Sequence, residues 1–218
     1  LESEAFFDFI RLDSLWIETA PILADEVFAE VARLDDPQPA RGFTEVELGK
    51  ETEFVYLLRA EFAGGTAPGF DALRIRTGNR ASFRRLEMGA PLSVVDPSAV
   101  RQEEDGLVVQ FPERITRTNN APIRVVFAAQ VFEFAVIFEG EIFTVDSEVL
   151  PQAIVAGDAG TAISTNSLRV LSAADESPDF IQALTLSTPV LTPNGDGIHD
   201  QLTIRYSLFR LPGPVPVA

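Results

Sequence analysis

Alternation of apolar and polar positions is the strongest pattern along the chain, and residues 53–62 show it most clearly. One face would hold Phe54, Tyr56, Leu58, Ala60 and Phe62, and the other Val55, Leu57, Arg59 and Glu61. A period of two residues predicts a β-strand, because successive side chains of a strand point to opposite faces. The fully apolar face is expected to lie against a core.

Residues 123–138 are apolar on both faces in the same alternation. One face would carry Phe132, Phe134, Val136 and Phe138, and the other Val131, Glu133, Ala135 and Ile137. A strand that is apolar on both faces is typical of a sheet covered on both sides. We expect one long central strand here, or two strands joined by a bend.

Shorter segments repeat this pattern between turn-forming residues. The expected strands cover residues 7–16, 27–34, 44–48, 72–77, 82–88, 106–111, 141–145, 166–171 and 201–208. Residues 20–33 fit a strand or a short helix, and the β pattern around them favours a strand. Many short strands with turns rich in Gly, Pro, Asn and Asp predict an all-β fold, an antiparallel β-sandwich or jelly roll.

A change in composition after Leu171 divides the chain. Residues 1–172 are expected to form the sandwich module, either as one unit or as two related halves. Small and polar residues then predict a linker over residues 173–189. Residues 190–218 would follow as a partial immunoglobulin-like strand unit or as a strand exchanged with another molecule.

Composition and charge exclude several classes of function. The 218 residues include no Cys and one His, so thiol catalysis and Cys-ligated metal centres are excluded. A net charge of −16 argues against nucleic-acid binding, which needs clustered Lys and Arg. The longest apolar runs are interrupted by charges and do not reach the ~20 residues of a membrane span.

One motif stands out near the C-terminus. Residues 192–200 read Thr-Pro-Asn-Gly-Asp-Gly-Ile-His-Asp, and an alternating strand follows as far as Leu208. This stretch resembles the start of the immunoglobulin-like modules found in gliding-motility-associated C-terminal domains and in the flagellar hook-capping protein, except that His199 replaces the usual Asn. The resemblance covers residues 192–208 only. It implies an exported, extracellular or cell-surface bacterial protein in which such a module is a structural or anchoring part, and it does not imply an active site.

The motif also offers a candidate calcium site. Side-chain oxygens of Asn194, Asp196 and Asp200, with the carbonyl of Ile198, are spaced as in a tight oxygen-rich loop. The spacing departs from the EF-hand pattern, and no distal Glu completes it. The alternative is a compact double turn in which the glycines adopt positive φ and the Asx side chains cap the backbone.

No catalytic residues are predicted. His199 is the single candidate base, and no Gly-x-Ser-x-Gly elbow accompanies it. Glu133, Glu139 and Glu141 lie in apolar segments where burial would raise a carboxylate pKa, as glycoside chemistry requires. The alternative is that Glu133 pairs with an arginine such as Arg59 or Arg124, or that these strands are exposed at an edge.

The expected function is therefore structural. A strand over residues 201–208 would expose an apolar face of Leu202, Ile204, Tyr206 and Leu208, which predicts an interface with another copy or another domain by strand exchange. An extracellular filament or array built from such copies is one form this function could take. The competing hypothesis is a carbohydrate- or surface-ligand-binding module, for which Trp16 and Tyr56 would have to line a groove.

Overall fold

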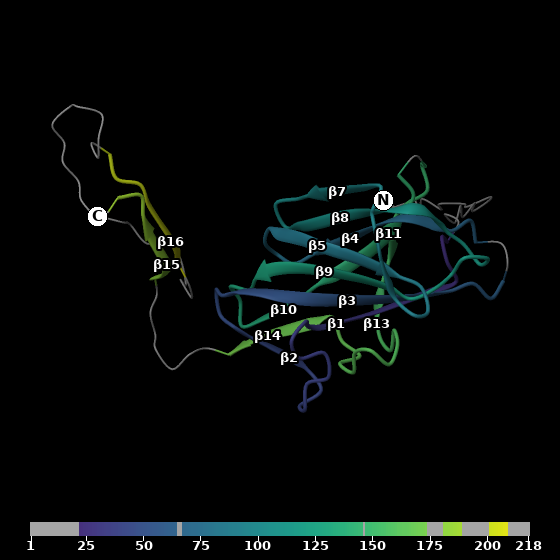
Figure 1. The fold of residues 1–218 in the computed structure, drawn as a ribbon, viewed down its shortest axis with the longest axis horizontal. Helices are drawn as coiled ribbons and strands as arrows, with labels where there is room; N and C mark the ends of the chain where they lie inside the picture. The colour runs from purple at the N-terminus through teal and green to yellow at the C-terminus, as the bar shows by residue number, and fades with distance from the viewer. Residues whose placement is uncertain (1–21, 65–66, 146, 174–180, 189–200, 209–218) are drawn as a thin grey trace, which may run out of the picture.

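A computed structural model describes residues 22–64, 67–145, 147–173, 181–188 and 201–208 of the chain (Figure 1). These residues hold strands and no helix, so the predicted all-β class is confirmed. The finer assignment to a sandwich or jelly roll stays a prediction. The strands are β1 (Glu26–Arg33), β2 (Thr44–Glu47), β3 (Glu51–Glu61), β4 (Phe70–Arg76), β5 (Ala81–Met88), β6 (Ser93–Val95), β7 (Ala99–Gln102), β8 (Gly106–Ile115), β9 (Ile123–Gln130), β10 (Ala135–Ile137), β11 (Glu139–Phe143), β12 (Gln152–Ala153), β13 (Val155–Ala156), β14 (Arg169–Ala173), β15 (Ile181–Leu186) and β16 (Ile204–Leu208).

The strands form four sheets. The six-stranded sheet has the order β13-β1-β3-β9-β5-β6, and the five-stranded sheet has the order β12-β11-β4-β8-β7. A three-stranded sheet, β10-β14-β2, and the hairpin β15-β16 complete the described strands. Pairing is antiparallel except between β1 and β13 and between β14 and β2.

β3 is a central strand whose two faces are both buried from Phe54 to Leu58. The sequence pattern predicted the apolar face against the core, whereas the burial of the opposite face was not predicted. Phe54, Tyr56 and Leu58 belong to the main apolar cluster, while Val55 and Leu57 belong to a second, smaller cluster on the opposite face. Phe54 contacts Phe127 and Phe138 of the main cluster at ring-centroid distances of 5.8 and 5.0 Å. The main cluster draws side chains from the six-, five- and three-stranded sheets, so the sheets are packed together through it.

The apolar run at residues 123–138 is two strands rather than one. β9 lies between β3 and β5 and ends at Gln130, and β10 then pairs with β14 in a different sheet. The expectation of two covered faces fails in the second half, where Phe134 is 69% exposed. Apolar alternation does not by itself show which sheet a strand joins, because the chain changes sheets at the bend.

A buried glutamate anchors the cover of the smaller cluster. Glu30 of β1 is fully buried, and its carboxylate accepts hydrogen bonds from the backbone N–H groups of Ala159 (3.2 Å) and Asn166 (3.0 Å). Residues 157–166, which we call the strap, thereby lie over the outer face of the six-stranded sheet, where Ala159 and Ile163 complete the smaller cluster. A fully buried carboxylate needs such donors, because an unpaired buried charge is strongly destabilising.

The C-terminal strands differ from the expected arrangement in one respect. β15 lies inside the range expected to be a linker, so β16 has an antiparallel partner from its own chain. The alternation over residues 201–208 predicted β16 correctly, whereas the expected strand at residues 7–16 lies outside the described residues. The short strands β6, β7, β12 and β13 were not predicted.

Replacing Glu30 with Gln should destabilise the fold by about 3 kcal/mol, because two hydrogen bonds to a charged, buried acceptor are weakened. Urea unfolding measures the change. Glu26→Gln, an exposed carboxylate on the same strand, is the matched control and should leave the midpoint nearly unchanged. Equal effects of the two variants would contradict the anchoring role of Glu30.

Candidate functional site

A crevice opens where the sheets diverge beside β11. The chain crosses from the three-stranded to the five-stranded sheet between β10 and β11, and from the five-stranded to the six-stranded sheet between β12 and β13. The space left between these crossings and β14 has a volume of about 480 Å³. We call it the β11–β14 crevice; it is lined by Arg76, Ile137, Glu139, Gly140, Glu141, Ala153, Ile154, Ala156, Ser167, Leu168 and Arg169.

Gly140 is required in the wall of the crevice. A Cβ at this position would lie 2.2 Å from the Tyr56 hydroxyl and 2.7 Å from Cδ1 of Ile154. The Tyr56 ring is fully buried, and its hydroxyl has no hydrogen-bond partner in the described part of the protein. Burial raises the pKa of this phenol, so Tyr56 stays neutral. Because its ring is fully buried, Tyr56 cannot serve as a stacking platform for a ligand.

Two of the charged residues in the crevice are held by ion pairs. Glu141 accepts a hydrogen bond from Nη1 of Arg76 (3.0 Å) and another from Nη1 of Arg74 (3.2 Å). The hydrogen bond that Arg76 donates to Glu141 raises the pKa of Arg76, and the nearby Asp105 adds to this effect. Arg74 also donates a hydrogen bond to Glu103 and lies over the Phe143 ring, so this rim is a connected network across β4, β11 and the β7–β8 turn.

The other two charged residues have no such partner. Glu139 and Arg169 are exposed, and neither forms an ion pair with a described residue. Glu139 lies opposite Arg76 in the β11–β4 ladder, yet Arg76 pairs with Glu141 and Asp105 instead. The crevice therefore presents one unneutralised carboxylate and one unneutralised guanidinium between apolar walls.

The carboxylates considered for acid–base chemistry do not form a buried pair. Glu133 and Glu139 are exposed, so the burial on which a raised pKa depends is absent at both. The suggested pairing of Glu133 with Arg59 or Arg124 is wrong, because Arg59 pairs with Glu61 and Arg124 with Glu87. Among the described residues, no group of three or more His, Asp or Glu is arranged to hold a metal ion.

Two of the three arginines in the densest basic segment, residues 80–85, are neutralised within the protein. Arg84 pairs with Glu51 and Glu53, and Arg85 pairs with Glu87. Glu87 also accepts from Arg124 and is nearly buried. Burial acts to raise the pKa of Glu87, but the hydrogen bonds from the two guanidiniums outweigh it, and the net pKa is lowered.

The residues predicted to form an interface lie on β16 or just before it. Leu202 is 37% exposed and Ile204 is 50% exposed, as an interface strand requires before it meets its partner. Leu186 on β15 is 51% exposed and was missed, because its segment was expected to be a linker. Tyr206 and Leu208 lie on β16, but their side chains are outside the description.

The candidate calcium ligands Asn194, Asp196, Ile198 and Asp200 lie outside the described residues, in the connection from β15 to β16. His199 and Trp16 lie outside them as well. No helix in the described ranges is long and apolar enough to cross a membrane. Arg169 was not predicted as a site residue. Its position on β14, in the wall of the crevice, is what distinguishes it from the other exposed arginines.

Comparison with protein-family models found no match, and comparison with curated proteins found none either. The resemblance of residues 192–208 to immunoglobulin-like modules therefore stays a prediction.

Gly140→Ala should destabilise the protein by about 2 kcal/mol, because the added methyl overlaps the Tyr56 hydroxyl. Tyr56→Phe alone should be neutral or slightly stabilising, since it removes a buried hydroxyl without a partner. In the double variant the loss should be smaller than in Gly140→Ala, as thermal and urea unfolding can measure. Strict additivity would show that the two positions do not interact.

Stability should fall on acidification partly through Glu87. Its pKa is lowered in the folded state from the ordinary 4.5, so its ion pairs stabilise the fold fully above that value. The stabilisation is lost as pH falls through 4.5 toward the lowered folded-state pKa. Urea unfolding of Glu87→Gln should show a loss on the order of 1 kcal/mol at pH 7 that shrinks at acid pH, whereas Glu148→Gln should parallel the parent protein.

Proposed function

We propose that the protein is a structural and interaction module of an exported bacterial surface protein, which joins a second copy through its hairpin β15–β16. The observation that carries the proposal is the exposed apolar character of a sheet with only two strands. Leu186 and Ile204 are opposite each other in the β15–β16 ladder, and each is about half exposed. A two-stranded hairpin is marginally stable by itself, and a further strand or a covering surface stabilises it.

The hairpin also has free backbone groups at its outer edges. β15 and β16 pair with each other and with no other described strand, so each has one unpaired edge. Addition of a strand from another molecule satisfies such an edge through main-chain hydrogen bonds, and alternate side chains supply specificity. The alternation that places Ile204, Tyr206 and Leu208 at every second position suits this mode.

Acceptor edges are present on the body of the protein. Among the described strands, β7 pairs only with β8, and all four of its residues are exposed. Within the same ranges, β6 pairs only with β5 and exposes Val94. Repeated addition of one copy's hairpin to the next copy's edge is a head-to-tail contact, which generates a filament or an array rather than a closed pair.

Export to the extracellular space or the cell surface is supported by the resemblance of residues 192–208 and by the acidic balance, which favours solubility. Calcium is proposed as a ligand of the β15–β16 connection through Asn194, Asp196, Ile198 and Asp200. Carbohydrate binding is the less favoured function, because Tyr56 is fully buried and no aromatic side chain lines the β11–β14 crevice.

Light scattering coupled to size separation tests the proposal on the full chain. The parent protein should associate more at higher concentration, and Ile204→Lys or Leu186→Lys should leave it monomeric at every concentration. Leu150→Lys is the matched control, because Leu150 is 68% exposed but lies outside the hairpin. Repeating the series with a calcium chelator shows whether the ion supports the contact. A parent protein that stays monomeric throughout would overturn the assembly proposal.

A further inference from the structure

We infer that the β11–β14 crevice is a binding site for a short zwitterion, a molecule that carries one ammonium and one carboxylate group a few bonds apart. The carboxylate of Glu139 would hold the ammonium group, and the guanidinium of Arg169 would hold the carboxylate. This site is independent of the hairpin contact proposed above.

The charges of the crevice select the ligand. Most described arginines form an ion pair with a described carboxylate, and Arg80, Arg117, Arg169 and Arg205 form none. Of these four, only Arg169 lines the crevice, where Glu139 is likewise unpaired. The two are not paired with each other, because no ion pair within 4.0 Å joins them in the structure. A ligand with both charges can bridge them, whereas a ligand with one charge leaves the other group unsatisfied.

The walls suit a small aliphatic molecule. Ile137, Ile154 and Leu168 contribute apolar surface, and the volume of about 480 Å³ falls in the range of small-molecule sites. No aromatic residue lines the crevice, so it lacks the flat surface on which a sugar ring stacks. A free amino acid and a charged short peptide share the required chemistry.

Hydrogen bonds hold the walls in place before any ligand arrives. Phe138 donates its N–H to the Leu168 carbonyl (2.8 Å), and Ile154 donates to the Gly140 carbonyl (2.9 Å). The anchor of the strap ends beside the crevice, since the N–H of Asn166 is bonded to Glu30 and Ser167 follows it. A site with fixed walls loses little free energy to ordering when a ligand binds.

The test uses a series of zwitterions of increasing length as a molecular ruler. Backbone amide shifts of the full chain are followed by NMR during titration with glycine, 3-aminopropanoate, 4-aminobutanoate and 6-aminohexanoate. One length should bind best, with a dissociation constant on the order of 1 mM, and should shift residues 137–141 and 167–169. Propionate, ethylamine and glucose serve as single-charge and sugar controls and should not saturate.

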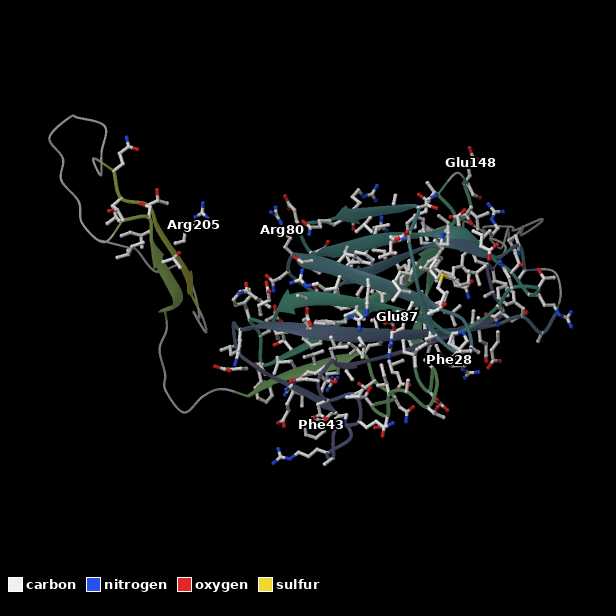
Figure 2. The ribbon with its side chains drawn as sticks, in the orientation of Figure 1. Phe28, Phe43, Arg80, Glu87, Glu148 and Arg205 are labelled. Atoms are coloured by element: carbon white, nitrogen blue, oxygen red, sulfur yellow. The ribbon has the colours of Figure 1, made fainter. Side chains whose placement is uncertain are left out.

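Charge variants separate this site from general surface binding. Glu139→Gln and Arg169→Gln should each weaken binding of the best zwitterion by about tenfold or more. Arg80→Gln and Glu148→Gln change exposed unpaired charges that do not line the crevice, both labelled in Figure 2, and should leave binding unchanged. The double reversal Glu139→Arg with Arg169→Glu keeps both charges and should restore binding, with the ligand reversed in the crevice.

A final comparison distinguishes the two kinds of ligand, a free amino acid and a charged short peptide. A capped dipeptide of glutamate and lysine is titrated beside the free amino acids, and preferential binding of either one supports the site. The inference is overturned by any of three results. These are absence of saturable shifts at the crevice for every zwitterion, equal binding by the parent protein and both single variants, and saturation by glucose or a single-charge control.

Discussion

Burial of β3 on both faces is the constraint on which the rest of the fold depends. Its alternating side chains leave no face for water, so apolar side chains must cover each side. On one side the main cluster, shared with the five-stranded sheet, supplies this cover. On the other side the cover is the strap, and Glu30 is the group that ties the strap to the sheet. A carboxylate in an apolar region is tolerated here because two backbone donors satisfy it.

The crossings that bring the cover into place also create the crevice. One short segment, residues 152–156, pairs first with β11 and then with β1, and so belongs to two sheets in succession. Sheets that exchange strands in this way cannot stay in contact along their whole edge, and side chains fill the gap only in part. The unpaired charges Glu139 and Arg169 therefore lie at the place where the main-chain pairing changes from one sheet to the next.

Sequence periodicity predicted the strands that are long and buried, and it could not predict features that depend on distant pairing. β3 was predicted as a strand with Phe54, Tyr56 and Leu58 against the core, but the burial of Val55 and Leu57 in a second cluster was not predicted. The role of Glu30 was not predicted, since its donors are more than 120 residues away in the chain. The sequence could not predict that Arg169 and Glu139 act as a pair either. The property that distinguishes them is that neither forms an ion pair with a described residue. The candidate calcium ligands were chosen from local spacing alone.

The anchor of the strap has a consequence for the order in which the protein folds. β1 pairs with β3, which follows it closely in the chain. The other edge of β1 and the buried carboxylate of Glu30 obtain their partners only from residues 153–167. Contacts of such long sequence separation form late, because closing the intervening loop costs conformational entropy before any bond is made. On the ribosome, β1 therefore emerges well before its cover and presents an unpaired edge during that interval. The nascent chain is most prone to aggregate in this period, and a charged residue in the middle of β1 reduces the chance that two such edges join.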